Sequence, residues 1–274
     1  MGLLKGTIQN NGGTQFINKR LIQVLLKPRN RGLTMVFDKG MGLRKTRDLL
    51  ELCHRYIDFW KIGFGSSLLY EPAILQQKIK LVNSFNIVTF PGGTLTEIAI
   101  AQGKLRSYLE WVLAQGFKAI EVSDGTIDLG VAQRENAIKS ALKAGLTVFT
   151  EVGKKDKNAV FCPESIASQM FKDLEAGASK VTVEARESGT GIMIFNDEGN
   201  IAQEKFTKLL ANMPAQEKII WETPLKKQQV TFLNMFGPEV NLGNIAPEDI
   251  LSLASLRAGL RSDTLKQALA KELV

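Results

Sequence analysis

The sequence predicts an α/β fold, a closed (β/α)8 TIM barrel with a short N-terminal arm. Two observations carry this prediction: short apolar runs alternate with amphipathic segments after residue 30, and eight such runs can be counted. Parallel strands buried on both faces read as continuous apolar runs, and eight strand–helix units favour closure. An open doubly wound sheet is the structural alternative. The 274 residues fit one barrel, because barrels of about 250 residues form single domains.

The strands are expected where four to six apolar residues follow one another, at 33–37, 58–62, 87–90, 118–122, 146–151, 180–184, 218–221 and 239–242. Each run ends in a charged or glycine-rich cluster. Because the carboxyl ends of barrel strands converge on one mouth, we expect these clusters to form a single active-site rim.

The helices are expected between the strands, at 44–57, 71–84, 95–115, 129–144, 163–176, 201–212, 225–236 and 247–260, with a tail helix near 264–273. In the first of them Leu49, Leu50, Cys53 and Ile57 recur at helical spacing. Glycines stand before four strands, where a helix end favours positive φ: Gly116, Gly145, Gly177 and Gly237. The predicted organisation is an arm over residues 1–30 and a barrel with a C-terminal tail helix over residues 31–274.

Composition excludes several classes of protein. Cys53 and Cys162 are too few for a disulfide framework or a cysteine zinc site. No apolar run approaches the roughly 20 residues that span a bilayer, so we expect a soluble, cytoplasmic protein without membrane contact. The net charge is +7, but no basic stretch is interleaved with aromatic residues. We therefore expect no nucleic-acid partner and assign the excess cations to the surface and to an anionic small molecule.

Acidic residues stand at five of the predicted strand ends: Asp38, Asp124, Glu151, Glu184 and Glu222. Mg²⁺ takes oxygen ligands and keeps several waters, so one or two acids suffice when a substrate supplies the rest. We predict Asp124, Glu151 and Glu184 as candidate metal ligands. The alternative for each acid is an ion pair with Lys39, Lys61 or Arg186 that holds the loops.

Lys155 is the leading catalytic candidate. Glu151, Gly153 and Lys155 share one side of the chain if the strand stays extended through them, so the carboxylate and the amine could touch one ligand. A lysine desolvated beside acids can donate a proton or form a Schiff base, whereas a lysine beyond a strand end is commonly a solvated surface charge.

Three loops carry small residues that let backbone N–H groups approach a phosphate. They begin at Pro91, Arg186 and Asn241. The predicted substrate-binding residues in them are Arg186, Ser188, Gly189, Gly93, Thr94, Asn241, Gly243 and Asn244. Ordinary tight turns would explain the same glycines.

The runs at 33–40, 56–63, 91–95, 121–125, 150–155 and 184–189 resemble the phosphosulfolactate synthase family of coenzyme M biosynthesis, as do those at 228–230, 240–246 and 256–261. The resemblance implies a (β/α)8 barrel that adds sulfite to phosphoenolpyruvate with Mg²⁺, giving (2R)-phospho-3-sulfolactate. It also implies that Lys155, the second lysine of the Glu-Val-Gly-Lys-Lys run, is the proton donor. Lys39 and Lys61 are the further catalytic candidates, which with Arg186 would offset repulsion between two anionic substrates.

Two other functions stay open at this point. One is a phosphate-binding aldolase in which Lys155 or Lys61 forms a Schiff base with a keto substrate. The other is a non-catalytic stress-related barrel, because the same family includes plant heat-stress-associated relatives. The sequence leaves the oligomeric state open, a homo-oligomer included.

Overall fold

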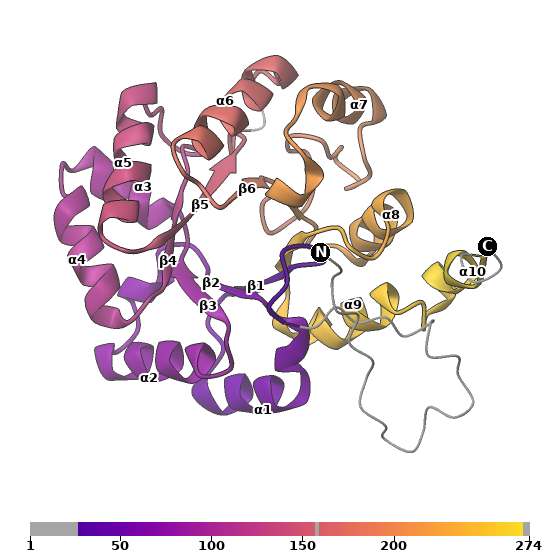
Figure 1. Cartoon of the computed structure of the whole chain (residues 1–274), viewed down its shortest axis with the longest axis horizontal. Coiled ribbons are helices and arrows are strands. Elements are labelled where there is room, and N and C mark those ends of the chain that lie inside the picture. Colours follow the sequence, from indigo (N-terminus) through magenta and orange to yellow (C-terminus); the bar gives the residue numbers. More distant parts are fainter. Residues whose placement is uncertain (1–26, 157–158, 271–274) are drawn as a thin grey trace.

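The barrel is visible in a computed structural model that describes residues 27–156 and 159–270 (Figure 1). Within these residues eight parallel strands occupy the centre and the helices surround them. The hydrogen-bonded order is β3-β2-β1-β8-β7-β6-β5-β4. Next to the two end strands of this order, the Lys118 N–H donates to the Thr89 carbonyl across 3.1 Å. The predicted closed barrel is therefore confirmed over the open sheet.

The strands are short and buried: β1 Thr34–Asp38, β2 Phe59–Ile62, β3 Val88–Pro91, β4 Ala119–Val122, β5 Thr147–Val152, β6 Lys180–Val183, β7 Ile219–Glu222 and β8 Leu242–Ile245. Seven lie within one residue of their predicted bounds. The prediction for β8 was wrong by three residues, because Gly243 and Asn244 interrupt its apolar pattern. Asn241 thus precedes this strand rather than ending it.

The helices are α1 Leu43–Cys53, α2 Pro72–Asn83, α3 Thr94–Ala101, α4 Leu105–Gln115, α5 Val131–Lys143, α6 Pro163–Glu175, α7 Gln203–Asn212, α8 Lys226–Phe236, α9 Ile250–Arg257 and α10 Ser262–Ala270. The single helix expected over 95–115 is two, separated around Gly103, whose φ is +66°. Gly116, Gly145, Gly177 and Gly237 all have positive φ, as expected. Among the described residues, no helix has both the length and the apolar character that crossing a membrane requires.

Side chains that alternate along the strands fill the barrel in layers. An apolar layer contains Met35, Phe90, Ala119, Phe149 and Ile220. Because side chains alternate with a period of two, the next inward position on each strand lies two residues further toward the mouth. On four strands that position is polar: Phe59 is followed by Lys61, Ala119 by Glu121, Phe149 by Glu151 and Ile220 by Glu222. The apolar layer therefore forms the floor of a charged one.

The predicted arm can be followed only in part, because residues 1–26 lie outside the described residues. The segment that joins β1 is held to the amino-terminal end of the barrel. Arg29 donates two hydrogen bonds to the Asp58 carboxylate, at 2.9 and 2.8 Å, and Lys180 Nζ donates to the Asn30 carbonyl at 3.0 Å. Residues 29 and 30 are therefore packed against the barrel.

Candidate active site

Lys61 is the centre of a buried ionic cluster at the mouth of the barrel. Its Nζ lies 2.9 Å from Glu121 Oε1, 2.9 Å from Glu151 Oε2 and 3.4 Å from Glu222 Oε1. These partners come from β4, β5 and β7, so one cation ties together strands on several sides of the barrel. The Lys61 side chain is only 6% exposed. Such a charge is tolerable only because it is paired and hydrogen-bonded.

Lys155 lies in the loop after β5 and reaches back to the same cluster. Its Nζ is 3.3 Å from Glu151 Oε1 and 3.5 Å from Glu184 Oε2. Glu151 and Lys155 therefore meet as expected, although the strand does not stay extended through Lys155: β5 ends at Val152, and Gly153 has a φ of +121°. The aliphatic part of Lys155 crosses Gly125, where an added Cβ would lie 3.1 Å from Lys155 Cε. Unlike Lys61, this lysine is 29% exposed and so has access to the mouth.

The charges in this cluster shift the pKa values of its members in opposite directions. Burial opposes the charge of Lys61 and Lys155, but neighbouring glutamates outweigh it and raise the pKa of both lysines above the usual range. Burial also disfavours the charge of Glu151, yet the two ammonium groups hold its pKa below the usual value. Both lysines are therefore protonated at neutral pH, and Glu151 is ionised.

The remaining glutamates carry the excess negative charge of the cluster. Burial raises the pKa of Glu121 to about 7, with the Lys61 ammonium acting in the opposite direction. Burial and the nearby carboxylates of Glu151 and Glu222 raise the pKa of Glu184. Burial raises that of Glu222 as well, against the attraction of Lys61. Carboxylates that cannot all be neutralised by two lysines favour either added protons or a further cation.

The oxygen atoms present fit a hard divalent cation. One carboxylate oxygen from each of Glu151, Glu184 and Glu222 lies within 4.8 Å of the other two. Among the described residues, Glu151 Oε1, Glu184 Oε2 and Asn244 Oδ1 are buried and accept no hydrogen bond, although Lys155 forms ion pairs with the two carboxylates. Mg²⁺ prefers such an all-oxygen set. Of the predicted ligands, Glu151 and Glu184 belong to this group; their role stays a prediction.

A cavity of about 150 Å³ opens above the cluster. Its lining comes from the ends of several strands and the loops after them: Phe37, Lys61, Phe64, Gly92, Gly93, Thr94, Glu121, Glu151, Lys155, Glu184, Arg186, Glu187, Glu222 and Asn244. The rings of Phe37 and Phe64 meet edge to face, with centroids 5.3 Å apart, and form an apolar part of the wall. The cavity thus combines charge at its base with an apolar side.

Two predicted substrate-binding residues lie where β3 joins α3. The Gly93 N–H donates to Glu121 Oε2 at 2.9 Å, and Thr94 is the first residue of α3. A Cβ at Gly93 would lie 2.4 Å from Ser123 Oγ, so no larger residue fits without a shift. Both residues line the cavity, and binding of substrate by them stays a prediction.

Arg186 and Asn244 also line the cavity as predicted substrate-binding residues. Arg186 has a φ of +58°, its N–H donates to Glu184 Oε1, and its guanidinium is 3.4 Å from the Lys155 carbonyl. Asn244 Nδ2 donates to the Arg186 carbonyl at 3.3 Å. These contacts hold the Arg186 backbone against Glu184 and Asn244 and bring its guanidinium to the Lys155 carbonyl, at the wall of the cavity.

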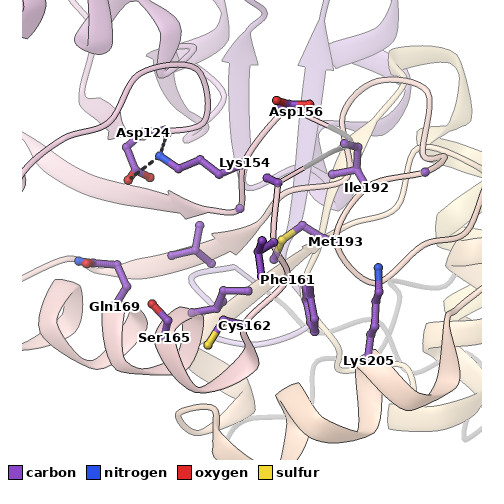
Figure 2. Close-up of a pocket in the computed structure, with 16 residues that line it drawn as sticks. Asp124, Lys154, Asp156, Phe161, Cys162, Ser165, Gln169, Ile192, Met193 and Lys205 are labelled. Atoms are coloured by element: carbon purple, nitrogen blue, oxygen red, sulfur yellow. Dashed lines mark hydrogen bonds and ion pairs between the residues drawn. The ribbon is translucent and has the colours of Figure 1, made fainter.

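Asp124 does not join the glutamates with which the sequence grouped it. Its Oδ1 is 3.1 Å from Arg134 Nη1, and its Oδ2 is 3.2 Å from Lys154 Nζ. Figure 2 shows its carboxylate facing the Lys154 amine on the edge of a second cavity, of about 240 Å³. Glu222 takes the third place in the oxygen group instead. The predicted grouping failed because Arg134 on α5 and Lys154 bind the Asp124 carboxylate outside the cluster.

The structure does not bring several other predicted residues into the cavity. Lys39 is 57% exposed and pairs with Glu187 at 3.6 Å, on the rim. Asn241 Oδ1 accepts the Leu33 N–H, and its Nδ2 donates to the carbonyls of Glu217 and Ile219. These partners start β1 and β7, so Asn241 lies at the opposite end of the barrel from the glutamates. Its expected place at the mouth was wrong, as a consequence of the shifted β8.

The remaining predicted glycine and serine residues make packing contacts or hydrogen bonds within the protein. A Cβ at Gly243 would lie 2.6 Å from Met35 Cε, so this glycine leaves room for the apolar floor. The Gly189 carbonyl accepts a hydrogen bond from Gln228 Nε2 at 2.7 Å, and the Ser188 hydroxyl accepts one from Thr190 at 3.4 Å. None of the three lines the cavity, and contact with substrate stays untested.

Glu121 is a site residue that the sequence did not single out, although it falls within the expected strand 118–122. A signal was present: Glu121 is a charged residue inside a short strand that is otherwise apolar. In a sheet covered by helices, such a residue has to point into the barrel and find a partner there. Lys61 is that partner.

Comparison with known proteins agrees with the geometry. A family profile described as (2R)-phospho-3-sulfolactate synthase (ComA) matches residues 23–263. Phosphosulfolactate synthase of Methanothermobacter thermautotrophicus is 43% identical over 241 residues, which cover 87% of this chain and 93% of that protein. Phosphosulfolactate synthase of Bacillus subtilis is 36% identical over 244 residues, which cover 87% and 94%.

Solved structures support the fold alone. The crystal structure of 3-hexulose-6-phosphate synthase from Salmonella typhimurium has a TM-score of 0.53 to this chain at 13% identity, covering 87% of this chain and 99% of that one. The family match spans every strand of the barrel and every residue of the charged cluster. The chain therefore belongs to the (2R)-phospho-3-sulfolactate synthase family.

Proposed function

We propose that this chain catalyses the Mg²⁺-dependent addition of sulfite to phosphoenolpyruvate, giving (2R)-phospho-3-sulfolactate. The observation that supports this most directly is the position of Lys155, with Nζ 3.3 Å from Glu151 and 3.5 Å from Glu184 beside a small cavity. A volume of about 150 Å³ suits a three-carbon substrate better than a drug-sized ligand, whose pockets span about 300–1,000 Å³.

The reaction needs two things from the protein: positive charge beside the substrate carboxylate, and a proton donor for one carbon atom. The sulfur lone pair of sulfite forms a bond to the methylene carbon of phosphoenolpyruvate. The electrons of the double bond move toward the carboxylate, which becomes an enediolate. A proton then forms a bond with the carbon that bears the phosphate ester, and no group leaves.

Lys155 is suited to supply this proton. Its raised pKa keeps the amine protonated at neutral pH, and its partial exposure lets it face a substrate in the cavity. The same raised pKa argues against a Schiff-base role, because a nucleophilic amine has to be neutral. Lys61, whose pKa is raised as well, is held by three glutamates and serves to fix their positions.

Arg186 and the apolar wall of the cavity have proposed roles in binding the phosphate and in directing the proton. The Arg186 guanidinium lies at the cavity and offers a fork of donors that matches a phosphate. Phe37 and Phe64 form an apolar part of the wall that offers no proton donor, so that protonation would come from Lys155. Delivery from one side accounts for a single stereochemical product. Lys39, on the rim, would attract anions to the mouth.

The carboxylates of Glu151, Glu184 and Glu222 would hold Mg²⁺. A metal bound there supplies Lewis-acid charge for a substrate carboxylate that takes up electrons. The chain's own contribution is to keep together three oxygen donors, on β5, directly after β6 and on β7, and Lys61 supports this by binding two of these glutamates.

The test is an assay of phosphoenolpyruvate consumption with and without sulfite and Mg²⁺, with the product identified by 31P and 13C NMR. We expect consumption only when both are present, loss of activity in a chelator, and recovery on addition of Mg²⁺. Folded protein that consumes no phosphoenolpyruvate in the presence of sulfite would indicate the non-catalytic barrel instead. Activity that persists in chelator would exclude an essential metal.

A further inference from the structure

The loop that carries Lys155 is tied to the loop after β4 by its backbone and by the side chain of Lys154. The Lys155 N–H donates to the Gly125 carbonyl at 2.9 Å. Lys154 Nζ donates to the Asp124 carbonyl at 2.6 Å and to the Ile127 carbonyl at 3.3 Å. Two neighbouring lysines therefore act differently. Lys155 lines the active-site cavity. Lys154 lines the second cavity and binds Asp124 of the adjacent loop (Figure 2).

The Asp124 carboxylate is the joint between Lys154 and a buried arginine. One oxygen faces Lys154 Nζ at 3.2 Å, and the other faces Arg134 Nη1 at 3.1 Å. Arg134 in turn forms two hydrogen bonds with Asp173, and its Nη2 donates to the Glu151 carbonyl at 2.9 Å. We call Asp124, Arg134 and Lys154 the latch. The latch touches the backbone of Glu151 on one side and adjoins Lys155 on the other.

The loop to which the latch is attached is itself held in place. Glu97 is buried on α3, and its Oε2 accepts hydrogen bonds from the backbone N–H groups of Thr126 and Ile127, each at 3.0 Å. Its Oε1 accepts one from the Ser123 hydroxyl at 2.6 Å. A carboxylate that satisfies several loop donors fixes the loop as a rigid support. The latch therefore joins the Lys155 loop to a loop that Glu97 holds in place.

We propose that Asp124 is a positioning residue, which by pairing with Arg134 and Lys154 holds the backbone of Glu151 and Lys155 in the register that proton delivery needs. This inference rests on the proposed function, in which Lys155 supplies the proton. The chain needs such a restraint here, because Gly153, with a φ of +121°, separates Lys154 and Lys155 from β5. Without the latch, the loop beyond this glycine would lose the side-chain contacts that join it to Arg134, although the Lys155 N–H would still bind the Gly125 carbonyl and Lys155 Nζ would still face Glu151 and Glu184.

Lys154 also pairs with a second carboxylate, which provides a matched control. Asp128 Oδ1 lies 2.9 Å from Lys154 Nζ, but the Asp128 side chain is 97% exposed, and Arg134 forms its ion pairs with Asp124 and Asp173 instead. Exposed ion pairs contribute little because water screens them. Asp124→Asn and Asp128→Asn therefore make the same chemical change at two partners of one amine, of which only the first belongs to the latch.

The experiment compares the steady-state kinetics of these two variants. Displacement of a catalytic group by about 1 Å can cost about 10²-fold in rate, so we expect Asp124→Asn to lower kcat by roughly tenfold or more. The KM for phosphoenolpyruvate and the Mg²⁺ concentration for half-maximal activity should stay within about twofold. Asp128→Asn should match the wild type. An unchanged kcat in Asp124→Asn, or a raised Mg²⁺ requirement that marks Asp124 as a metal ligand, would overturn the proposal.

A second pair of variants approaches the latch from its exposed partner, in case Asp124→Asn does not fold. Lys154→Met removes the cation and should lower kcat in the same way, whereas Lys154→Arg keeps a donor for Asp124 and should retain more activity. Equal activity of the two would contradict the latch.

Hydrogen exchange of the Lys155 amide separates this inference from the proposed function, because it needs no substrate. Exchange should be faster in Asp124→Asn than in Asp128→Asn, and equal rates would overturn the latch. If the wild-type protein consumes no phosphoenolpyruvate, the proposed function fails, and the exchange result still decides whether Asp124 holds the loop.

Discussion

Replacement of Lys61 by methionine tests whether the buried cluster depends on its central cation. The change keeps the length and apolar stem of the side chain but removes the ammonium that contacts Glu121, Glu151 and Glu222. The three carboxylates would remain buried beside one another, with only the partly exposed Lys155 near Glu151. The barrel would then have to protonate them, admit water or lose stability.

The expected size follows from the burial of these groups. Breaking a buried ion pair by removing one partner costs about 3–5 kcal/mol. For a domain of this length each kcal/mol lowers Tm by about 2–4 °C, so Lys61→Met should melt roughly 6–20 °C below the wild type. The loss should be smaller at pH 5 than at pH 8. The glutamate pKa values rise without Lys61, so protonation relieves the repulsion at the lower pH.

Thermal unfolding followed by circular dichroism at pH 5 and pH 8 measures both effects. Lys39→Met is the matched control, because Lys39 is exposed and its ion pair with Glu187 is worth at most about 1 kcal/mol. A Lys61→Met protein that melts within about 2 °C of this control at pH 8 would refute the view of Lys61 as the stabilising cation.

Three further outcomes are expected. Lys155→Ala should lower kcat for phosphoenolpyruvate and sulfite by about 10²-fold or more, and turnover near the wild-type value would assign the proton to another group. Arg186→Ala should raise the KM for phosphoenolpyruvate about tenfold, as the loss of a charge-assisted hydrogen bond predicts, whereas an unchanged KM would limit this arginine to holding the loop. Glu121 has a pKa raised to about 7, so its neutral form favours folding, and its contribution to stability is lost as pH rises from about 4.5 to 7. Glu121→Gln should remove that part of the pH dependence of Tm; equal slopes for the two proteins would contradict the assignment.

The order of elements was predictable because buried parallel strands and amphipathic helices leave different periodicities. Alternation also predicted that Glu151 and Lys155 meet, although β5 ends at Val152 and Lys155 reaches the carboxylate from the loop beyond Gly153. The two-helix segment over 94–115 was not, because its apolar pattern continues through Gly103. Sequence pattern gives the type of an element more securely than the point where it is interrupted.

The acids near the ends of correctly placed strands were predictable. Glu222 ends β7, Glu184 directly follows β6, and both reach the cluster. Asn241 was misplaced because β8 contains Gly243 and Asn244, which do not look like strand residues. Asp124 stands just beyond β4, and its orientation depends on Arg134, a partner from a helix that no spacing rule links to it.

The apolar floor beneath the charged layer has a consequence for how this scaffold can change over time. In the layer below, apolar side chains fill the inward positions. Replacing a whole set of buried charges with apolar groups of similar volume often leaves the stability of a protein unchanged or raises it. Selection for stability alone would replace all four polar residues with apolar ones and leave a more stable barrel without activity. The presence of these four polar residues is thus consistent with a loss of folding stability in return for a charged active site.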